Sequence, residues 1–199
     1  MLQNTDIFER AFHYAAEKHS GQTRKLTDAP YILHPAEVTA IMATMTDDHE
    51  VLAAGMLHDV VEDTDTTLEE IEALFGRRVA LLVMTETEEK RPNRPASETW
   101  KLRKVETLLM LENTKDPAVK MLWLGDKLSN IRSFYRQVKH SGLEMFKYLN
   151  QKDPAEHEWY YRSIAKWLEP LKEFEAYQEY VRLVDEVFNM VKEAQAHEV

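Results

Sequence analysis

The sequence predicts an all-α protein that forms a single domain. Its 199 residues include only five glycines and seven prolines, too few for the many tight turns of a sandwich or barrel. Apolar residues recur at intervals of three and four along most of the chain, which is typical of amphipathic helices. No internal repeat or long linker divides the sequence, and its length fits one domain.

The first helix is predicted over residues 5–19, with Asn4 or Thr5 as its N-cap. The following stretch, GQTRKLTDAPYILHP, contains turn-forming residues and predicts a loop that ends at His34. Pro35 would take the first position of the second helix, because the missing N–H of proline costs nothing there.

Asp47 or Asp48 would cap a third helix that ends near Thr64. The sequence Thr-Thr-Leu-Glu at 66–69 matches a capping box and opens a short helix that stops at Gly76. A further helical pattern follows directly. This part of the chain is therefore predicted to be a series of short helices.

Residues 86–97 are highly charged, contain two prolines and lack apolar periodicity, so they predict a loop. A long helix follows over 97–113. The Asp-Pro pairs at 116–117 and 153–154 each predict the start of another helix. The last stretch, 171–196, is amphipathic and predicts a C-terminal helix.

The composition excludes several functions. With 35 acidic and 25 basic side chains, the formal charge of −10 disfavours binding to nucleic acids and to anionic membranes. The absence of cysteine excludes disulfides, thiolate metal sites and cysteine nucleophiles. The acidic N-terminal segment does not resemble a secretory peptide, and no apolar run approaches about 18 residues. The expectation is a cytoplasmic protein without a membrane partner.

The segment His-Asp-Val-Val-Glu-Asp-Thr at 58–64 gathers four ionisable groups after an apolar stretch. At about 100° per residue, His58, Asp59, Glu62 and Asp63 would share one face of a helix. Several buried carboxylates are costly without a compensating cation, so the pattern predicts a divalent metal. The alternative is a solvated acidic face with one incidental histidine.

His34 and Asp126 also interrupt apolar segments. Taken alone, His34 is typical of a hydrogen-bonded core histidine, and Asp126 of a salt bridge to its neighbour Lys127. Gly125 disfavours a helix by up to about 1 kcal/mol relative to alanine, so it indicates close approach of another segment.

In this order and context, the pattern H…HD…D resembles the HD superfamily of metal-dependent phosphohydrolases. It is more closely similar to the hydrolase domain of RelA/SpoT homologues and to the stand-alone small alarmone hydrolases. The similarity spans residues 10–135, within a family-like core of about 5–169. The matching pieces are GQTRK (21–25), APYILHP (29–35), HDVVEDT (58–64), ALFGRRVALLV (73–83) and LGDKLSNIR (124–132).

The resemblance implies an all-α HD fold and a reaction that removes the 3′-pyrophosphate of guanosine tetra- or pentaphosphate. It implies a divalent cofactor, most commonly Mn²⁺, which would polarise a phosphoryl oxygen and lower the pKa of water. Glu62 and Asp63 would then be catalytic, as general base and general acid. The implied metal ligands are His34, His58, Asp59 and Asp126.

The resemblance also implies contacts with a nucleotide substrate. Arg24 and Lys25 match a basic pair that contacts the nucleotide, although a solvated loop pair would have the same composition. Lys127 and Asn130 match polar residues that line the pocket. Tyr161 is a weaker match, and a core aromatic residue is the favoured alternative. The sequence leaves open whether the protein forms an oligomer.

The sequence departs from the family pattern at four positions: Leu26, Glu88, Gly125 and Ser129. Residues 84–88 stand in the stretch where the alarmone enzymes tend to read Gly-Val-Thr-Lys. In the register that sets Glu88 against that lysine, the acid would weaken binding of a polyphosphate. Two alternatives therefore remain. The protein could be an HD phosphohydrolase that acts on another nucleotide or phosphoester, or a binding protein that keeps the metal as a structural staple.

Overall fold

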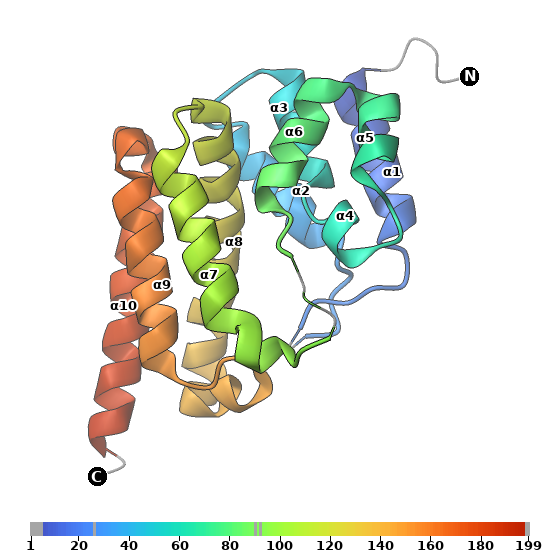
Figure 1. Ribbon diagram of the computed structural model, residues 1–199. Helices are drawn as coiled ribbons and strands as arrows, with labels where there is room; N and C mark the ends of the chain where they lie inside the picture. Colours follow the sequence, from blue (N-terminus) through green and yellow to red (C-terminus); the bar gives the residue numbers. More distant parts are fainter. Residues whose placement is uncertain (1–5, 26, 90, 92, 198–199) are drawn as a thin grey trace. The chain divides into compact units, whose positions relative to one another are not determined.

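The computed structural model describes residues 6–25, 27–89, 91 and 93–197, and none of these forms a strand. The all-α class is confirmed (Figure 1). The chain forms two compact units. The first comprises Met1–Thr87 with Asp116–Asp126, and the second comprises Glu88–Lys115 with Lys127–Val199. The organisation as one domain stays a prediction.

The first unit is arranged around helix α3. Its elements are α1 (Ile7–Lys18), α2 (Leu33–Met42), α3 (His49–Leu57), α4 (Val60–Asp63), α5 (Leu68–Phe75), α6 (Arg77–Glu86) and the beginning of α8 (Pro117–Ser141). Helix α3 packs against α1, α2 and α6. It is apolar on nearly all sides, as expected for a helix surrounded by protein. Because α3 ends at the buried Leu57, the next residue, His58, lies in the core of this unit.

Side-chain caps set several helix starts. The Asp6 carboxylate accepts a hydrogen bond from the N–H of Phe8 at 2.8 Å and caps α1, while Asn4 and Thr5 lie outside the described residues. Asp48 caps α3 as predicted, accepting hydrogen bonds from two main-chain N–H groups. Gly76 ends α5 with a φ of 90°, a conformation that side chains disfavour.

The cap of α5 lies one residue later than predicted. Thr67, not Thr66, accepts the hydrogen bond from the N–H of Glu70, at 3.2 Å. Thr66 is instead buried, and its hydroxyl lies 3.2 Å from that of Tyr14. Tertiary contacts thus decide between two adjacent threonines that the sequence pattern treats alike.

Helix α2 begins at Leu33, so the prediction that His34 ends a loop and Pro35 starts the helix was wrong by two residues. The first N–H groups of a helix have no intrahelical acceptor, so proline is accommodated throughout the first turn. Because it lies in that turn, His34 is held by regular helical backbone and not by a loop.

The predicted continuous helix to Thr64 is divided into α3 and α4 at His58 and Asp59. Asp59 has a ψ of −7°, far from the value of about −42° in an α-helix. The helix therefore turns where the side chains of the two predicted ligands, His58 and Asp59, leave the backbone. Asp63, at the end of α4, is exposed, and Glu62 is half-buried.

The second unit consists of α7 (Ala96–Asn113), the rest of α8, η1 (Gly142–Tyr148), α9 (Pro154–Trp167), η2 (Glu169–Leu171) and α10 (Glu175–His197). Helix α9 packs against both α7 and α10 (Figure 1). Within the predicted loop over 86–97, the described residues between α6 and α7 are not helical, while residues 90 and 92 lie outside the described residues. Helix α6 includes Glu86 and α7 begins at Ala96, so the loop is shorter than predicted at both ends. The C-terminal helix begins later than the predicted residue 171, because η2 precedes it.

Both Asp-Pro pairs open helices as predicted. Pro117 and Pro154 are the first residues of α8 and α9. The carboxylate of Asp116 accepts a hydrogen bond from the N–H of Ala118, and that of Asp153 accepts one from the N–H of Ala155, each at 2.9 Å. Proline at the first position and a capping carboxylate before it reinforce each other.

A histidine lies inside the aromatic core of the second unit. His157 is buried, and its ring centroid lies 5.2 to 5.6 Å from those of Trp100, Phe134 and Phe146. Its Nε2 lies 2.9 Å from the carbonyl oxygen of Gln151, which can only accept, so Nε2–H donates. Burial lowers the pKa of His157, so this core favours the neutral ring.

Acidification is expected to destabilise the protein through His157. Because its pKa is lower in the folded state, the unfolded chain binds the proton first as the pH falls below about 6.5. The contribution of His157 to the free energy of unfolding is therefore fully present above that pH. It is lost as the pH falls through the folded-state pKa, by about 1 kcal/mol per unit of pKa difference. His157→Gln should flatten the pH dependence in urea unfolding, while His140→Gln, at an exposed position, should leave it unchanged. Equal pH slopes for the parent and His157→Gln would contradict this expectation.

Candidate metal centre

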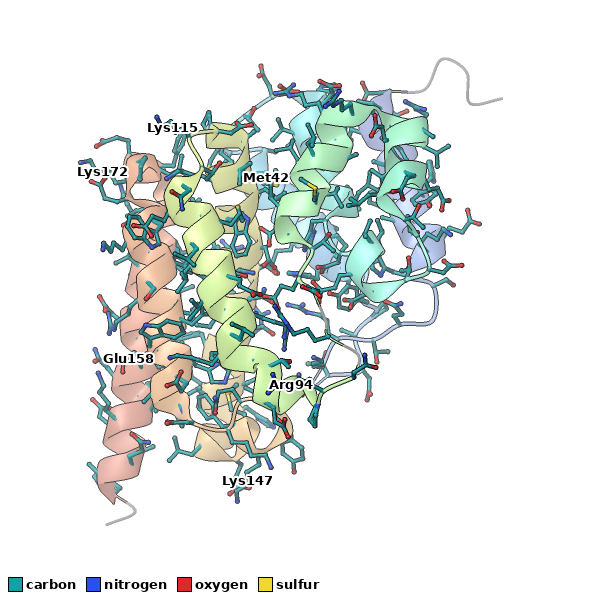
Figure 2. All side chains as sticks on the ribbon, viewed as in Figure 1. Met42, Arg94, Lys115, Lys147, Glu158 and Lys172 are labelled. Carbon is teal, nitrogen blue, oxygen red and sulfur yellow. The ribbon has the colours of Figure 1, made fainter. Side chains whose placement is uncertain are left out.

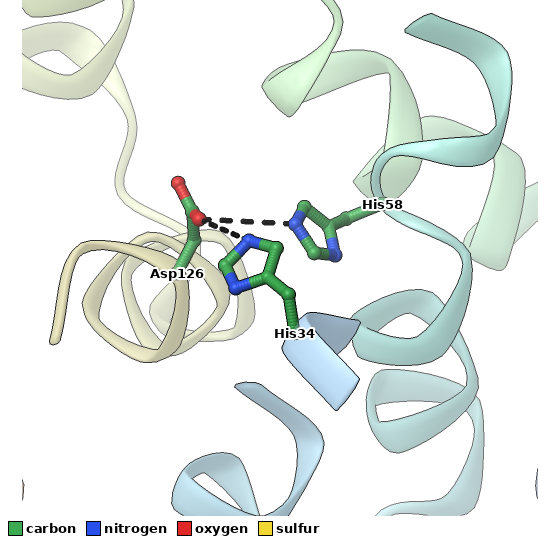
Figure 3. A group of neighbouring side chains, drawn as sticks. All are labelled: His34, His58 and Asp126. Atoms are coloured by element: carbon green, nitrogen blue, oxygen red, sulfur yellow. Dashed lines mark ion pairs between the residues drawn. The ribbon is translucent and has the colours of Figure 1, made fainter. Parts of the chain in front are cut away.

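Three of the four predicted metal ligands converge in the first unit. One potential ligand atom from each of His34, His58 and Asp126 lies within 4.8 Å of the others. Asp126 Oδ1 is 3.0 Å from Nε2 of His34 and 3.8 Å from Nε2 of His58 (Figure 3). All three residues are at most 5% exposed. Two imidazoles and a carboxylate thus form a buried polar group.

The fourth predicted ligand, Asp59, lies beside this group. Its Oδ2 is 3.0 Å from Nε2 of His58 and 3.5 Å from Nε2 of His34. Its side chain is 17% exposed. The three chain segments that the sequence separates, around positions 34, 58 and 126, therefore bring both imidazoles and both carboxylates together.

The ring orientation of His58 suits a cation. Its Nδ1 lies 2.8 Å from the carbonyl oxygen of Gly55, which can only accept, so Nδ1 carries the proton. Its Nε2 is buried and faces the two carboxylates, 3.0 Å from Oδ2 of Asp59 and 3.8 Å from Oδ1 of Asp126. A main-chain carbonyl that fixes the tautomer of an imidazole is the arrangement usual for metal-bound histidines. The residues present therefore fit a divalent ion.

The charges at the centre also favour a cation. Burial lowers the pKa of His34. Burial acts in the same direction on His58, but the carboxylates of Asp59 and Asp126 outweigh it and raise the pKa of His58 to about 10. Without another cation, a proton on His58 balances part of the carboxylate charge. A divalent ion would take over that role and release the proton.

Gly125 allows α8 to approach α2 closely, as the sequence predicted. A Cβ atom at position 125 would lie 3.1 Å from the carbonyl oxygen of Val38 and 3.0 Å from Cγ of Met42, which is labelled in Figure 2. An alanine at this position would therefore press against main-chain atoms of α2. The next residue in α8 is Asp126, so this contact places its carboxylate beside His34.

The two predicted catalytic residues differ in their surroundings. Both lie in the short helix α4, one turn after His58 and Asp59, but Glu62 is half-buried and Asp63 is exposed. The hydroxyl of Tyr31 donates to Oδ2 of Asp59 at 2.6 Å and lies 3.3 Å from Oδ2 of Asp63.

Tyr31 is a residue that the sequence reasoning did not single out. It lies in the matched segment APYILHP, three positions before His34, and a polar aromatic residue next to a ligand is a signal that could have been used. Burial and the nearby charges of Asp59 and Asp63 raise the pKa of Tyr31, so its hydroxyl remains a donor.

The predicted nucleotide contacts in the first unit lie in the loop before α2. The guanidinium of Arg24 is 5.8 Å from the centroid of the Tyr31 ring, a cation–π distance, and Lys25 is exposed. The neighbouring Leu26 lies outside the described residues. This geometry leaves the predicted roles of Arg24 and Lys25 untested.

The other predicted nucleotide contacts belong to the second unit. Lys127 is buried and Asn130 half-buried, both on α8. Tyr161 is 6% exposed and packs against Phe134, with ring centroids 5.5 Å apart. Its environment is that of a core aromatic residue, and its contact with a substrate stays a prediction.

Glu88 pairs with two cations of the second unit. Its carboxylate contacts the guanidinium of Arg103, and the Nζ of Lys104 lies 2.6 Å away. The three side chains are 10 to 17% exposed. Burial raises the pKa of Glu88, but the cations outweigh it and hold the value below the ordinary range. The acidic residue at this position therefore neutralises basic residues of its own unit.

Replacing Glu88 by glutamine is expected to lower the free energy of unfolding by about 3 kcal/mol, because Arg103 and Lys104 would lose a shared, mostly buried counter-charge. The matched control is Glu158→Gln. Glu158, labelled in Figure 2, also accepts from two cations, Arg162 and Lys192, at 2.8 and 2.7 Å. Those two cations are 43 and 57% exposed, so the control should lose less than about 1 kcal/mol. Equal losses in chemical denaturation would show that burial of the Glu88 pairs adds nothing.

The helical fold and this centre define a class: all-helical proteins with a buried histidine–aspartate metal centre. The family model described as HD domain matches residues 11–154, and the chain belongs to this family. Within the described part of the chain, no helix is both long and apolar enough to span a membrane.

Several relatives carry names that describe an activity. The chain is 41% identical over 133 residues to the guanosine-3′,5′-bis(diphosphate) 3′-pyrophosphohydrolase of Aquifex aeolicus (strain VF5), covering 67% of this chain and 18% of that protein. It is 39% identical over 124 residues to a probable enzyme of the same name from Synechocystis sp., covering 62% of this chain and 16% of that protein. The chain thus spans less than a fifth of the length of these curated relatives.

Two solved structures match more of their own length. The crystal structure of lmo0812 from Listeria monocytogenes EGD-e has a TM-score of 0.69 and 32% identity, covering 81% of this chain and 99% of that one. A structure described as a metazoan ortholog of SpoT that hydrolyses ppGpp has a TM-score of 0.70 and 27% identity, covering 93% and 95%.

Proposed function

We propose that this protein is a metal-dependent nucleotide phosphohydrolase that removes the 3′-pyrophosphate from guanosine tetra- or pentaphosphate. The observation that carries the proposal is the buried group of His34, His58 and Asp126, which lies inside the segment matched by the HD domain model. The substrate is inferred from the names of the relatives. The substrate is proposed and not established, because this chain corresponds to less than a fifth of the length of the relatives whose names give it.

The metal ligands in this proposal are His34, His58, Asp59 and Asp126. Two imidazoles with two carboxylates suit a first-row divalent ion better than Ca²⁺, and we propose Mn²⁺. When bound, the ion supplies Lewis acidity, which polarises a phosphoryl oxygen and makes water more acidic. The protein contributes the geometry, since the carbonyl oxygen of Gly55 holds the ring of His58 and Gly125 lets Asp126 approach.

Glu62 and Asp63 supply the proton transfers in this proposal. They lie one turn after His58 and Asp59, so their carboxylates can orient a water molecule beside the ligand set and accept its proton. As the water oxygen bonds to the phosphorus, the bond from that phosphorus to the ribose 3′-oxygen breaks, and the ribose 3′-oxygen needs a proton, which the same pair can return. The five predicted nucleotide contacts, Arg24, Lys25, Lys127, Asn130 and Tyr161, stay predictions.

The test is a nucleotide panel assayed with Mn²⁺ and with a chelator, together with the metal content of the purified protein. We expect metal bound in a one-to-one ratio and release of pyrophosphate from guanosine 3′,5′-bis(diphosphate) that the chelator abolishes. Turnover of other nucleotides without turnover of this one would overturn the substrate. A protein without metal that hydrolyses nothing would overturn the function.

A second candidate is hydrolysis of another nucleotide or phosphoester at the same centre. The observation that favours it is Glu88, whose carboxylate pairs with Arg103 and Lys104 at a position where the family pattern would carry a basic residue. A binding protein with a structural metal is the third candidate, and it requires that Glu62 have no catalytic effect. The cytoplasmic location and any oligomer stay predictions from the sequence.

A further inference from the structure

Three residues outside the proposed ligand set connect to it and to Asp63. They are His19, which is the C-cap of α1, Gln22 in the loop that follows, and Tyr31 just before α2. All belong to the first unit. His19 is 2% exposed, and its ring centroid lies 4.9 Å from that of Tyr31.

The hydrogen bonds of these residues have a defined direction. The Nε2 of Gln22 lies 2.9 Å from the main-chain carbonyl oxygen of Asp63, which can only accept. The amide oxygen of Gln22 therefore faces Nδ1 of His19, at 2.8 Å, and that nitrogen donates. The chain of bonds runs from His19 through Gln22 to the backbone of Asp63.

Tyr31 acts on the side chains of the same segment. Its hydroxyl donates to Oδ2 of Asp59 at 2.6 Å and lies 3.3 Å from Oδ2 of Asp63. Asp63 is thus held at its carbonyl by Gln22 and contacted at its carboxylate by Tyr31. The loop before α2 is itself held in place, because the N–H of Tyr31 donates to the carbonyl oxygen of Gln22 at 2.9 Å.

We propose that His19, Gln22 and Tyr31 form a brace that fixes the spacing between the carboxylate of Asp59 and that of Asp63. This inference rests on the proposed function, in which Asp59 holds the metal and Asp63 transfers protons. All three are positioning residues. Helix α4 has only four residues, too short to be stable alone, so its position depends on such contacts.

The decisive variant is Tyr31→Phe, which keeps the ring beside His19 and Arg24 but removes the hydroxyl. The matched control is Tyr14→Phe, because the Tyr14 hydroxyl also donates to a carboxylate of this unit, that of Glu70 at 2.7 Å. Supporting hydrogen bonds to metal ligands contribute about 10- to 100-fold to affinity or activity. We expect Tyr31→Phe to weaken Mn²⁺ binding and to lower kcat by factors in this range with KM unchanged, and Tyr14→Phe to change neither.

Gln22→Met provides the second measurement, since it removes the amide link to Asp63 and keeps the length of the side chain. It should lower kcat while Mn²⁺ affinity, measured by calorimetry, stays at the parent value. In the double variant that combines Gln22→Met with Tyr31→Phe, kcat should fall by less than the product of the two single effects, because both residues act on Asp63. If the parent binds metal and hydrolyses nucleotide and Tyr31→Phe matches it in both, the brace is refuted and the proposed function stands. If the parent does neither, both proposals fail together.

Discussion

Replacing Glu62 by glutamine is expected to lower kcat by roughly 10²- to 10⁴-fold, the usual contribution of a general acid or base. Glutamine has nearly the same shape but cannot accept a proton from water. Because Glu62 lies one turn beyond the ligand pair and outside the proposed ligand set, metal content and the unfolding temperature should stay at the parent values. The measurements are steady-state hydrolysis, metal analysis and thermal unfolding.

Glu72→Gln is the matched control for this prediction. Glu72 is an exposed glutamate on α5 of the same unit, and its replacement should leave hydrolysis unchanged. Parent-like hydrolysis by Glu62→Gln would remove Glu62 from the mechanism and favour Asp63 as the sole proton acceptor. A loss of metal in Glu62→Gln would instead make Glu62 a ligand.

Replacing His58 by alanine is expected to weaken metal binding by at least about 100-fold, since losing a ligand should cost more than losing a group that supports one. Hydrolysis should fall with metal occupancy. The variant should also be less stable, because Asp59 and Asp126 would keep their charges without the imidazole between them. Removing one partner of a buried ionic group costs about 3–5 kcal/mol. Calorimetric metal titration and chemical denaturation measure the two effects.

His13→Ala is the control for the loss of an imidazole, because His13 is exposed on α1. It should bind metal and unfold like the parent. If His58→Ala kept full metal affinity, the ion would have to be held elsewhere, and the proposed centre would be wrong. Excess Mn²⁺ that restored both stability and hydrolysis to His58→Ala would show a weakened centre and not an abolished one.

The helical elements were predictable from local patterns, whereas their boundaries were less so. Asp48 and the Asp-Pro pair at 153–154 act as the sequence predicts, because a cap depends on residues that are neighbours in the chain. Errors occurred where distant contacts select among similar residues. Thr67 replaces Thr66 as a cap because Thr66 is buried beside Tyr14.

The candidate site was predictable in its residue types and less so in its surroundings. The resemblance placed His34, His58 and Asp126 together, and the structure shows their ligand atoms within 4.8 Å. The sequence could not show that Asp59 accepts a hydrogen bond from Tyr31. The role of Glu88 also needed coordinates, because its partners Arg103 and Lys104 lie 15 and 16 positions away along the chain.

The sequence by itself determined the all-α class, the starts of α3, α8 and α9, and the chemical character of the centre, because periodicity, caps and the spacing of His and Asp residues are local properties. The tertiary structure decided which side chains surround that centre. It divided the helix at His58 and Asp59, joined Tyr31 to Asp59, and paired Glu88 with two cations. These features arise from packing between segments distant in the chain, and such packing is not encoded in any single stretch of sequence.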